Sequence, residues 1–210
     1  MYRWILTLLS CLLLGACSLP PFADEVLFVD HFSDNSFFSN KKNQEGNVVV
    51  EDGVLKITVE KPNGMMVTMP ALETQDVNVA INGWPQTTGE TVFYGITCRY
   101  FDSTNFVFFS LGSNGDANIT KVENGQVLVL AATLPNSQIG SNFGGRINSI
   151  SAICNGPELT FSVNGKAALQ ATDPLPLPGK VGIFASSQYT PRSVIFDDLT
   201  ISLPSGTVLP

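Results

Sequence analysis

Short, regularly spaced apolar runs are the feature of this sequence that most restricts its fold. From Val26 onward, β-branched and aromatic runs alternate with clusters of Gly, Asn, Asp and Pro at intervals of about 8 to 12 residues, as in an all-β sandwich or barrel. No segment has the length and periodicity of a helix. Strands are predicted at residues 26–32, 47–50, 54–60, 65–70, 76–82, 92–100, 106–111, 117–122, 126–132, 148–154, 159–163, 167–171, 180–185 and 194–201.

Turn residues and side-chain alternation refine this prediction. Asx-Gly pairs, which tolerate the positive φ of tight hairpin turns, separate apolar runs at residues 52–53, 124–125 and 164–165. Residues 54–60 alternate polar and apolar side chains, so one face of that strand should meet the core and the other water. Residues 106–109 are apolar at odd- and even-numbered positions alike, so both faces of this strand are apolar. This predicts a central strand that is covered on both sides.

Composition favours one exported domain and excludes some partners. A chain of 210 residues is long enough to bury a sizeable core as a single all-β domain. Its formal net charge is −7, and no cluster of basic residues is larger than Lys41-Lys42. Such a surface repels phosphate backbones, so nucleic acid is excluded as a partner.

The amino terminus reads as an export signal. Residues 1–3 form a short positive region, and residues 4–14 (WILTLLSCLLL) form an apolar run too short to span a membrane. The alternative is a buried core helix, for which a strand-rich chain offers no obvious packing partner. Residues 14–17 (LGAC) resemble the bacterial lipobox, in which the signal is cut before a cysteine that then carries lipid. This resemblance implies a membrane-anchored, extracytoplasmic lipoprotein with a signal peptide at 1–16, lipidated Cys17, a tether at 17–24, a domain at 25–203 and a tail at 204–210.

Cysteine usage agrees with export. If Cys11 leaves with the signal and Cys17 carries lipid, Cys98 and Cys154 remain as a potential disulfide in an oxidising compartment. Two buried free thiols are the alternative. With a single histidine and two distant cysteines, the sequence lacks the common zinc signatures.

Several segments resemble the concanavalin-like jelly-roll families, the laminin-G-like and lectin/glucanase group, across about residues 25–203. The resemblance implies an antiparallel jelly-roll β-sandwich, and it concerns mainly turn and core positions, which argue fold better than function. The matching segments are residues 27–32 (LFVDHF), 52–57 (DGVLKI), 94–100 (YGITCRY), 105–111 (NFVFFSL), 118–121 (NITK), 159–165 (LTFSVNG), 179–183 (GKVGI) and 196–199 (FDDL).

Catalytic residues are not evident. Hydrolases of this fold carry E-x-D-x-x-E on one strand, and the chain has no such motif. Retaining glycosidases need two carboxyl groups about 5 to 5.5 Å apart, whereas the sequence neighbours at 51–52 and 197–198 would point to opposite faces of a strand. Carboxylates distant in sequence could still converge. His31 is interpreted as a packed or edge residue, because no nucleophile motif accompanies it.

The resemblance also implies a possible structural calcium ion. Many domains of this fold hold Ca²⁺ where the first and last strands run side by side, and Asp30 and Asp198 occupy those two strands here. Carboxylate and carbonyl oxygens are the ligands that Ca²⁺ prefers. The alternative is that both residues are ordinary turn or edge-strand carboxylates.

Sugar binding would use an aromatic platform with nearby polar groups. Trp84 is predicted in a loop, where binding residues often lie, and Tyr94, Arg99, Tyr100 and Tyr189 are further candidates. The alternative for each tyrosine is burial in the core. Because Arg99 has the opposite strand parity from Cys98, it is expected to reach solvent or the other face of its sheet.

The sequence is therefore consistent with three functional hypotheses. The first is a non-catalytic carbohydrate-binding module tethered to the membrane, which the fold resemblance and the missing carboxylate motif favour. The second is a structural or protein-interaction module of the cell envelope. The third is a glycan-active hydrolase, which would need two carboxylates that meet only in the folded chain.

Overall fold

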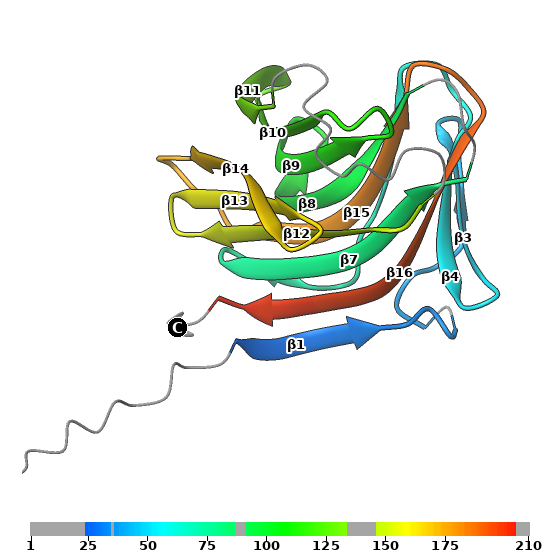
Figure 1. The fold of residues 1–210 in the computed structure, drawn as a ribbon, viewed down its shortest axis with the longest axis horizontal. Coiled ribbons are helices and arrows are strands. Elements are labelled where there is room, and N and C mark those ends of the chain that lie inside the picture. Colours follow the sequence, from blue (N-terminus) through cyan, green and yellow to red (C-terminus); the bar gives the residue numbers. More distant parts are fainter. Residues whose placement is uncertain (1–23, 35, 87–90, 134–145, 205–210) are drawn as a thin grey trace, which may run out of the picture.

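The computed structural model describes residues 24–34, 36–86, 91–133 and 146–204, and these residues form two antiparallel sheets packed face to face (Figure 1). The nine-stranded sheet has the order β14 (Lys166–Thr172), β13 (Glu158–Val163), β12 (Asn148–Asn155), β7 (Val77–Pro85), β16 (Arg192–Leu203), β4 (Val54–Val59), β3 (Gly46–Glu51) and β2 (Lys41–Lys42), with β1 (Glu25–Asp30) paired to β16. The seven-stranded sheet has the order β11 (Gln126–Ala132), β10 (Ala117–Glu123), β9 (Asn105–Gly112), β8 (Val92–Asp102), β15 (Gly179–Ser187) and β5 (Gly64–Thr68), with β6 (Glu73–Thr74) paired to β15.

Strands distant in sequence are neighbours in both sheets. The last long strand, β16, lies between β7 and β4, and β15 lies between β8 and β5. These crossings confirm the predicted all-β jelly-roll sandwich. No helix in the described part of the chain is long and apolar enough to cross a membrane. The predicted signal peptide, Cys17 and most of the tether lie outside the described residues.

The core lies between the sheets and is built by alternation along each strand. Val77, Val79 and Ile81 of β7 are buried, whereas the residues between them are only partly buried. Aromatic rings then close the space across the sandwich: the ring of Phe109 on β9 lies 5.9 Å from that of Phe161 on β13. Offset and edge-to-face ring contacts of this kind add to the free energy gained by apolar burial.

Three hairpin turns confirm the Asx-Gly predictions. Each of these pairs has positive φ at both residues, the conformation that a type I′ turn requires and that Gly adopts without strain. The pairs are Asp52-Gly53, Asn124-Gly125 and Asn164-Gly165.

The position of strand β9 explains why residues 106–109 are apolar on both faces of the strand. Val107 and Phe109 face the core, and Phe106 and Phe108 lie on the opposite face of the sheet. On that outer face, rings of the same sheet shield one another: Phe106 and Phe108 are 5.7 Å apart, and Phe108 and Phe184 are 5.5 Å apart. β9 is therefore central in its sheet, as predicted, but neighbouring rings cover its outer face.

Candidate ligand-binding pocket

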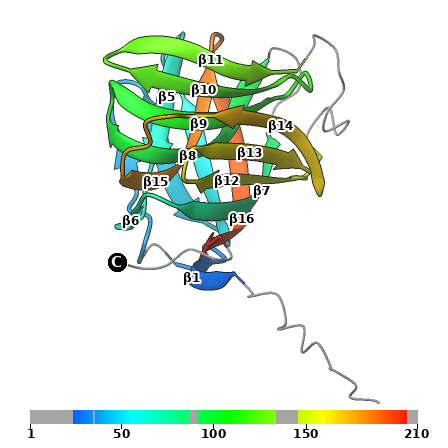
Figure 2. The same ribbon diagram turned by 90° about the vertical axis from the view of Figure 1, so that its left-hand side faces the viewer.

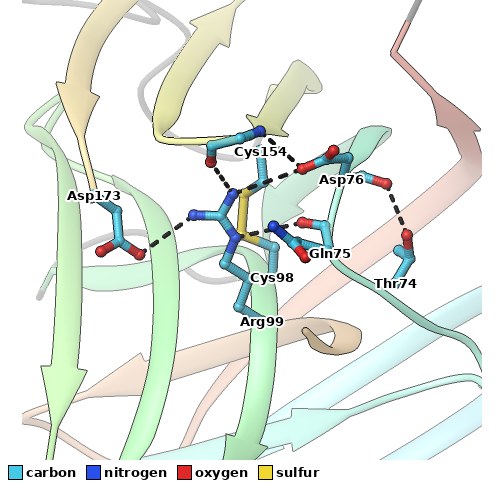
Figure 3. The surroundings of a disulfide bond; sticks show 8 residues. Thr74, Gln75, Asp76, Cys98, Arg99, Cys154 and Asp173 are labelled. Atoms are coloured by element: carbon cyan, nitrogen blue, oxygen red, sulfur yellow. Dashed lines mark hydrogen bonds and ion pairs between the residues drawn. A yellow bond between two sulfur atoms is a disulfide. The ribbon is translucent and has the colours of Figure 1, made fainter. Parts of the chain in front are cut away.

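The confirmed disulfide fixes one end of the sandwich. Cys98 on β8 and Cys154 on β12 are both buried and joined, with their Cα atoms 6.9 Å apart, so the bond ties the seven-stranded sheet to the nine-stranded sheet (Figure 3). It therefore holds together two strands that share no backbone hydrogen bonds. Two buried charged residues, Arg99 and Asp173, lie near this bond (Figure 3).

A β-bulge directly after Cys98 corrects the prediction for Arg99. The pairing of β8 with β9 shifts register between Cys98 and Asp102, and Arg99 has a φ of 55°. A bulge breaks the simple alternation of side chains, so Arg99 does not take the opposite face. It is 3% exposed, and the expectation that it reaches solvent is wrong.

Buried Arg99 is surrounded by acceptors from three separate segments. Its Nη1 donates to Asp173 Oδ2 at 3.3 Å, its Nε donates to the backbone oxygen of Gln75, and its Nη2 donates to the backbone oxygen of Gly156 (Figure 3). Asp76 Oδ1 lies 4.0 Å from Nη2. Burial lowers the pKa of Arg99, and the charges of Asp173 and Asp76 oppose this shift.

Lys121 continues the charge network toward the surface. Its Nζ lies 3.0 Å from Asp173 Oδ1 and 2.8 Å from Glu123 Oε1, and its side chain remains partly exposed. Burial by itself lowers the pKa of Lys121, but hydrogen bonds and charges from Glu123 and Asp173 outweigh it, so the pKa is raised. Both oxygens of buried Asp173 are thus engaged by cations.

These side chains form one wall of a pocket, which we call the Asp173 pocket. It is a small hollow, open to solvent, with a cavity volume of about 30 Å³, and it is lined by Arg99, Lys121, Glu123 and Asp173 on its polar side. Three strongly exposed apolar side chains lie at its rim: Phe101 is 71% exposed, Leu175 73% and Leu177 60%. The hollow and its rim thus bring paired polar groups next to exposed apolar side chains, a combination that ligand sites use.

The remaining predicted aromatic residues are spread over the molecule. Tyr100 lies at the end of β8 beside the pocket wall, with its ring 5.2 Å from that of Phe106. Burial and the charge of Asp102 raise the pKa of Tyr100. Tyr189 is half exposed after β15, where its backbone N–H donates to Ser187. Neither residue lines the Asp173 pocket.

Two aromatic predictions are corrected. Tyr94 is 1% exposed in the core, where its hydroxyl accepts a hydrogen bond from Asn148 at 3.0 Å, so it cannot meet a ligand from solvent. Trp84 lies within strand β7 rather than in a loop, opposite Ile195 of β16, and it is partly buried. It therefore belongs to the nine-stranded sheet and does not line the pocket.

The two predicted calcium ligands lie on neighbouring strands, and three of their four carboxylate oxygens already have partners. Asp30 Oδ1 accepts a hydrogen bond from the backbone N–H of Phe32 at 2.7 Å. Asp198 Oδ1 lies 2.9 Å from His31 Nδ1, and Asp198 Oδ2 accepts from Asn82 at 3.0 Å. Within the described residues, no group of three or more His, Cys, Asp or Glu could hold a metal ion. The calcium site at Asp30 and Asp198 therefore stays a prediction.

Sequence reasoning missed most of the pocket. Lys121 and Asp173 are 52 residues apart, and no local motif links them. One available signal was the segment at 173–178 (DPLPLP), where two leucines alternate with prolines in a loop and so have no strand in which to be buried.

Comparisons with solved structures show which known fold this chain shares. No family model matches the sequence, and no curated protein does. Among solved structures, a Bacillus subtilis protein of unknown function with a galectin-like fold superimposes with a TM-score of 0.64 at 12% identity, covering 88% of this chain and 99% of that one. This chain shares the jelly-roll sandwich fold.

Two further structures of that fold carry names that refer to carbohydrates. Bacillus licheniformis β-glucanase superimposes with a TM-score of 0.61 at 12% identity, covering 86% of this chain and 98% of that one. The carbohydrate-binding module CBM66 from Bacillus subtilis has a TM-score of 0.54 at 12% identity, with 87% and 99% covered. At such identities the likeness concerns the fold alone.

Proposed function

We propose that this chain is a non-catalytic carbohydrate-binding domain and that the Asp173 pocket is its ligand site. The observation that carries the proposal is the composition of the pocket: fixed, mutually paired charges on one wall and an exposed aromatic ring at the rim. Solved structures of the same fold include a carbohydrate-binding module, which supports the proposal by analogy only.

The paired charges favour an uncharged ligand. Arg99 is compensated by Asp173, and Lys121 is compensated by Glu123 and Asp173, so the wall offers no unbalanced charge to a cation or an anion. It does offer donors and acceptors in fixed directions. Among the charged residues that line the pocket, Lys121 and Glu123 reach solvent, and both could bond the hydroxyl groups of a sugar.

The apolar rim supplies the second part of sugar recognition. A pyranose ring has an apolar face of C–H groups, which packs on an aromatic ring. Phe101 lines the pocket and leaves most of its surface in water, although an exposed phenyl ring gains nothing from that position in the free protein. A bound sugar would cover Phe101 while its hydroxyl groups bonded Lys121 and Glu123.

The same geometry argues against hydrolysis. Lys121 lies between the carboxylates of Glu123 and Asp173, and Asp173 is buried with both oxygens bonded to cations, so Asp173 is poorly placed to attack a sugar. On the outer face of the seven-stranded sheet, the described positions that alternate with core residues on β9 and β10 hold no carboxylate. They are Phe106, Phe108, Ser110, Asn118, Thr120 and Val122.

The test is glycan-array binding by the full chain with Cys17→Ser, with and without added Ca²⁺. We expect a specific glycan signal that is lost in Phe101→Ala and in Glu123→Gln, which remove the platform and an acceptor. Tyr189→Ala is the matched control, because Tyr189 is exposed but does not line the pocket, and its signal should persist. A blank array, or binding that survives both pocket variants, would overturn the proposal and redirect the search to envelope proteins.

We also propose that Cys17 anchors the domain to a membrane outside the cytoplasm, on the strength of the signal-like residues 1–16 and the lipobox-like residues 14–17. Several acyl chains give stable attachment where one chain is marginal. Labelling of cells with a radioactive fatty acid should mark the wild-type chain and not Cys17→Ser. Equal labelling of the two would contradict this anchor.

A further inference from the structure

Strand β11 forms a free edge of the seven-stranded sheet. It pairs with β10 on one side, and no strand of the described chain pairs with its other side (Figure 2). An unpaired edge exposes a row of backbone N–H and C=O groups that another strand can bond. The edge of β11 is therefore a place where a second chain could extend the sheet.

The exposed half of β11, residues 127–129, lacks the devices that usually block such pairing. Residues Gln126–Ala132 (QVLVLAA) contain no charge and no proline. Val127 is 65% exposed, Leu128 42% and Val129 63%. The register shift against β10 falls between the partners Val129 and Ala131, so the exposed half of the strand is regular. Natural edge strands usually carry lysine, proline or a disruptive bulge, so an uncharged apolar edge indicates an interface.

The register of β11 matches a second copy of itself. Val127 and Val129 lie on the outer face of the sheet, opposite Val122 and Thr120, and Leu128 lies on the other face, opposite Lys121. In an antiparallel pair centred on Leu128, Val127 of each copy meets Val129 of the other on one face. The two Leu128 side chains then meet on the opposite face. A twofold axis requires this kind of self-complementarity.

Charge also favours contact at this edge. Each chain carries a formal net charge of −7, so two copies repel over most approaches. The uncharged strand β11 offers a neutral strip where that repulsion is smallest, and its apolar side chains would leave water on pairing.

We propose that two copies of this chain associate by antiparallel pairing of their β11 strands. The pairing makes one continuous sheet across the dimer and satisfies backbone groups on both edges. Residues of β11 do not line the Asp173 pocket, so both pockets stay open in the dimer. Since Glu123 sits at the β10–β11 turn, the antiparallel arrangement places the two pockets toward opposite ends of the shared edge.

Sedimentation velocity of the full chain with Cys17→Ser is the first test. We expect a concentration-dependent dimer, which Val129→Lys converts to monomer because it places two like charges at the joined edge. Tyr189→Lys adds the same charge at another exposed position and should leave the dimer intact. Circular dichroism of Val129→Lys checks that the sandwich still forms. A chain that is monomeric at its highest soluble concentration would overturn the proposal.

Cross-linking tests the register independently of any destabilising charge. Leu128→Cys should form an intermolecular disulfide under mild oxidation, because the two Leu128 positions face each other at the axis. Val127→Cys should cross-link efficiently only when mixed with Val129→Cys. A dimer that persists in Val129→Lys, or that shows no cross-link through position 128, would use another surface or another register and would contradict the proposal.

Discussion

Arg99 donates a hydrogen bond to Asp173 at 3.3 Å although 74 residues separate them, and both side chains are buried. This pair joins the bulge of β8 to the segment that follows β14, and it holds the polar wall of the Asp173 pocket. A buried ion pair of this kind has a cost of desolvation that only its partners offset. The pair therefore tests how the pocket is held together.

A double-mutant cycle measures that coupling. We expect Asp173→Ala to lower the free energy of unfolding by roughly 3 kcal/mol, because Arg99 would stay buried without its main partner. Arg99→Met should cost less, since Asp173 would still pair with Lys121. The double variant should cost clearly less than the sum of the two single variants. Urea unfolding under oxidising conditions gives the three values, and additive effects would show that the pair is not coupled.

Loss of the disulfide should weaken the whole domain. Cys98 and Cys154 are 56 residues apart in sequence, and in the chain-entropy model a closed loop of that length contributes about 4 kcal/mol. We expect Cys98→Ala with Cys154→Ala to lower the midpoint of urea unfolding and to increase the slope, because the unfolded chain without the bond exposes more surface. Reduction of the wild-type chain should reproduce the shift. A double variant as stable as the wild type would mean that the bond contributes nothing to folding.

Local signals in the sequence predicted the parts of the fold that depend on near neighbours. Asx-Gly pairs predicted the hairpin turns because their φ values are a local property, and alternation predicted the inward face of β4. Arg99 could not be placed in this way. Its bulge reverses the parity of β8, and the sequence carries no local mark of that bulge.

The pocket lies beyond local prediction for a related reason. Lys121 is on an inward position of β10, a place normally held by an apolar residue. A lysine is stable at that position because its charge pairs with Asp173, a residue distant in the sequence. A pattern that contradicts the core rule was thus a signal of the site, but its partner could be identified only in the folded chain.

Calcium binding can be tested at the predicted residues. Because Asp198 accepts hydrogen bonds from Asn82 and lies 2.9 Å from His31, its oxygens are occupied, and we expect added Ca²⁺ to leave the thermal midpoint unchanged. Chelation should also have no effect. An increase of the midpoint with Ca²⁺ that disappears in Asp30→Asn would show that these side chains rearrange to bind the ion.

Tyr94 should make the domain sensitive to alkaline pH. Burial raises the pKa of Tyr94 to about 12 from its ordinary value of 10.0, although the hydrogen bond from Asn148 opposes this shift. A raised pKa means that the folded chain holds this proton more tightly than the unfolded chain. The resulting stability is complete below pH 10 and is lost as the pH rises toward 12, by about 3 kcal/mol in total.

Replacing Tyr94 with phenylalanine separates this effect from other alkaline titrations. At neutral pH, Tyr94→Phe should cost about 1 kcal/mol, because Asn148 loses its partner in the core. The variant has no phenol to titrate at this position, so its stability should fall less steeply above pH 10. The two unfolding curves should therefore converge and then cross as the pH rises. Parallel losses of stability in wild type and variant would assign the alkaline transition to other groups, such as Tyr100, whose pKa burial also raises.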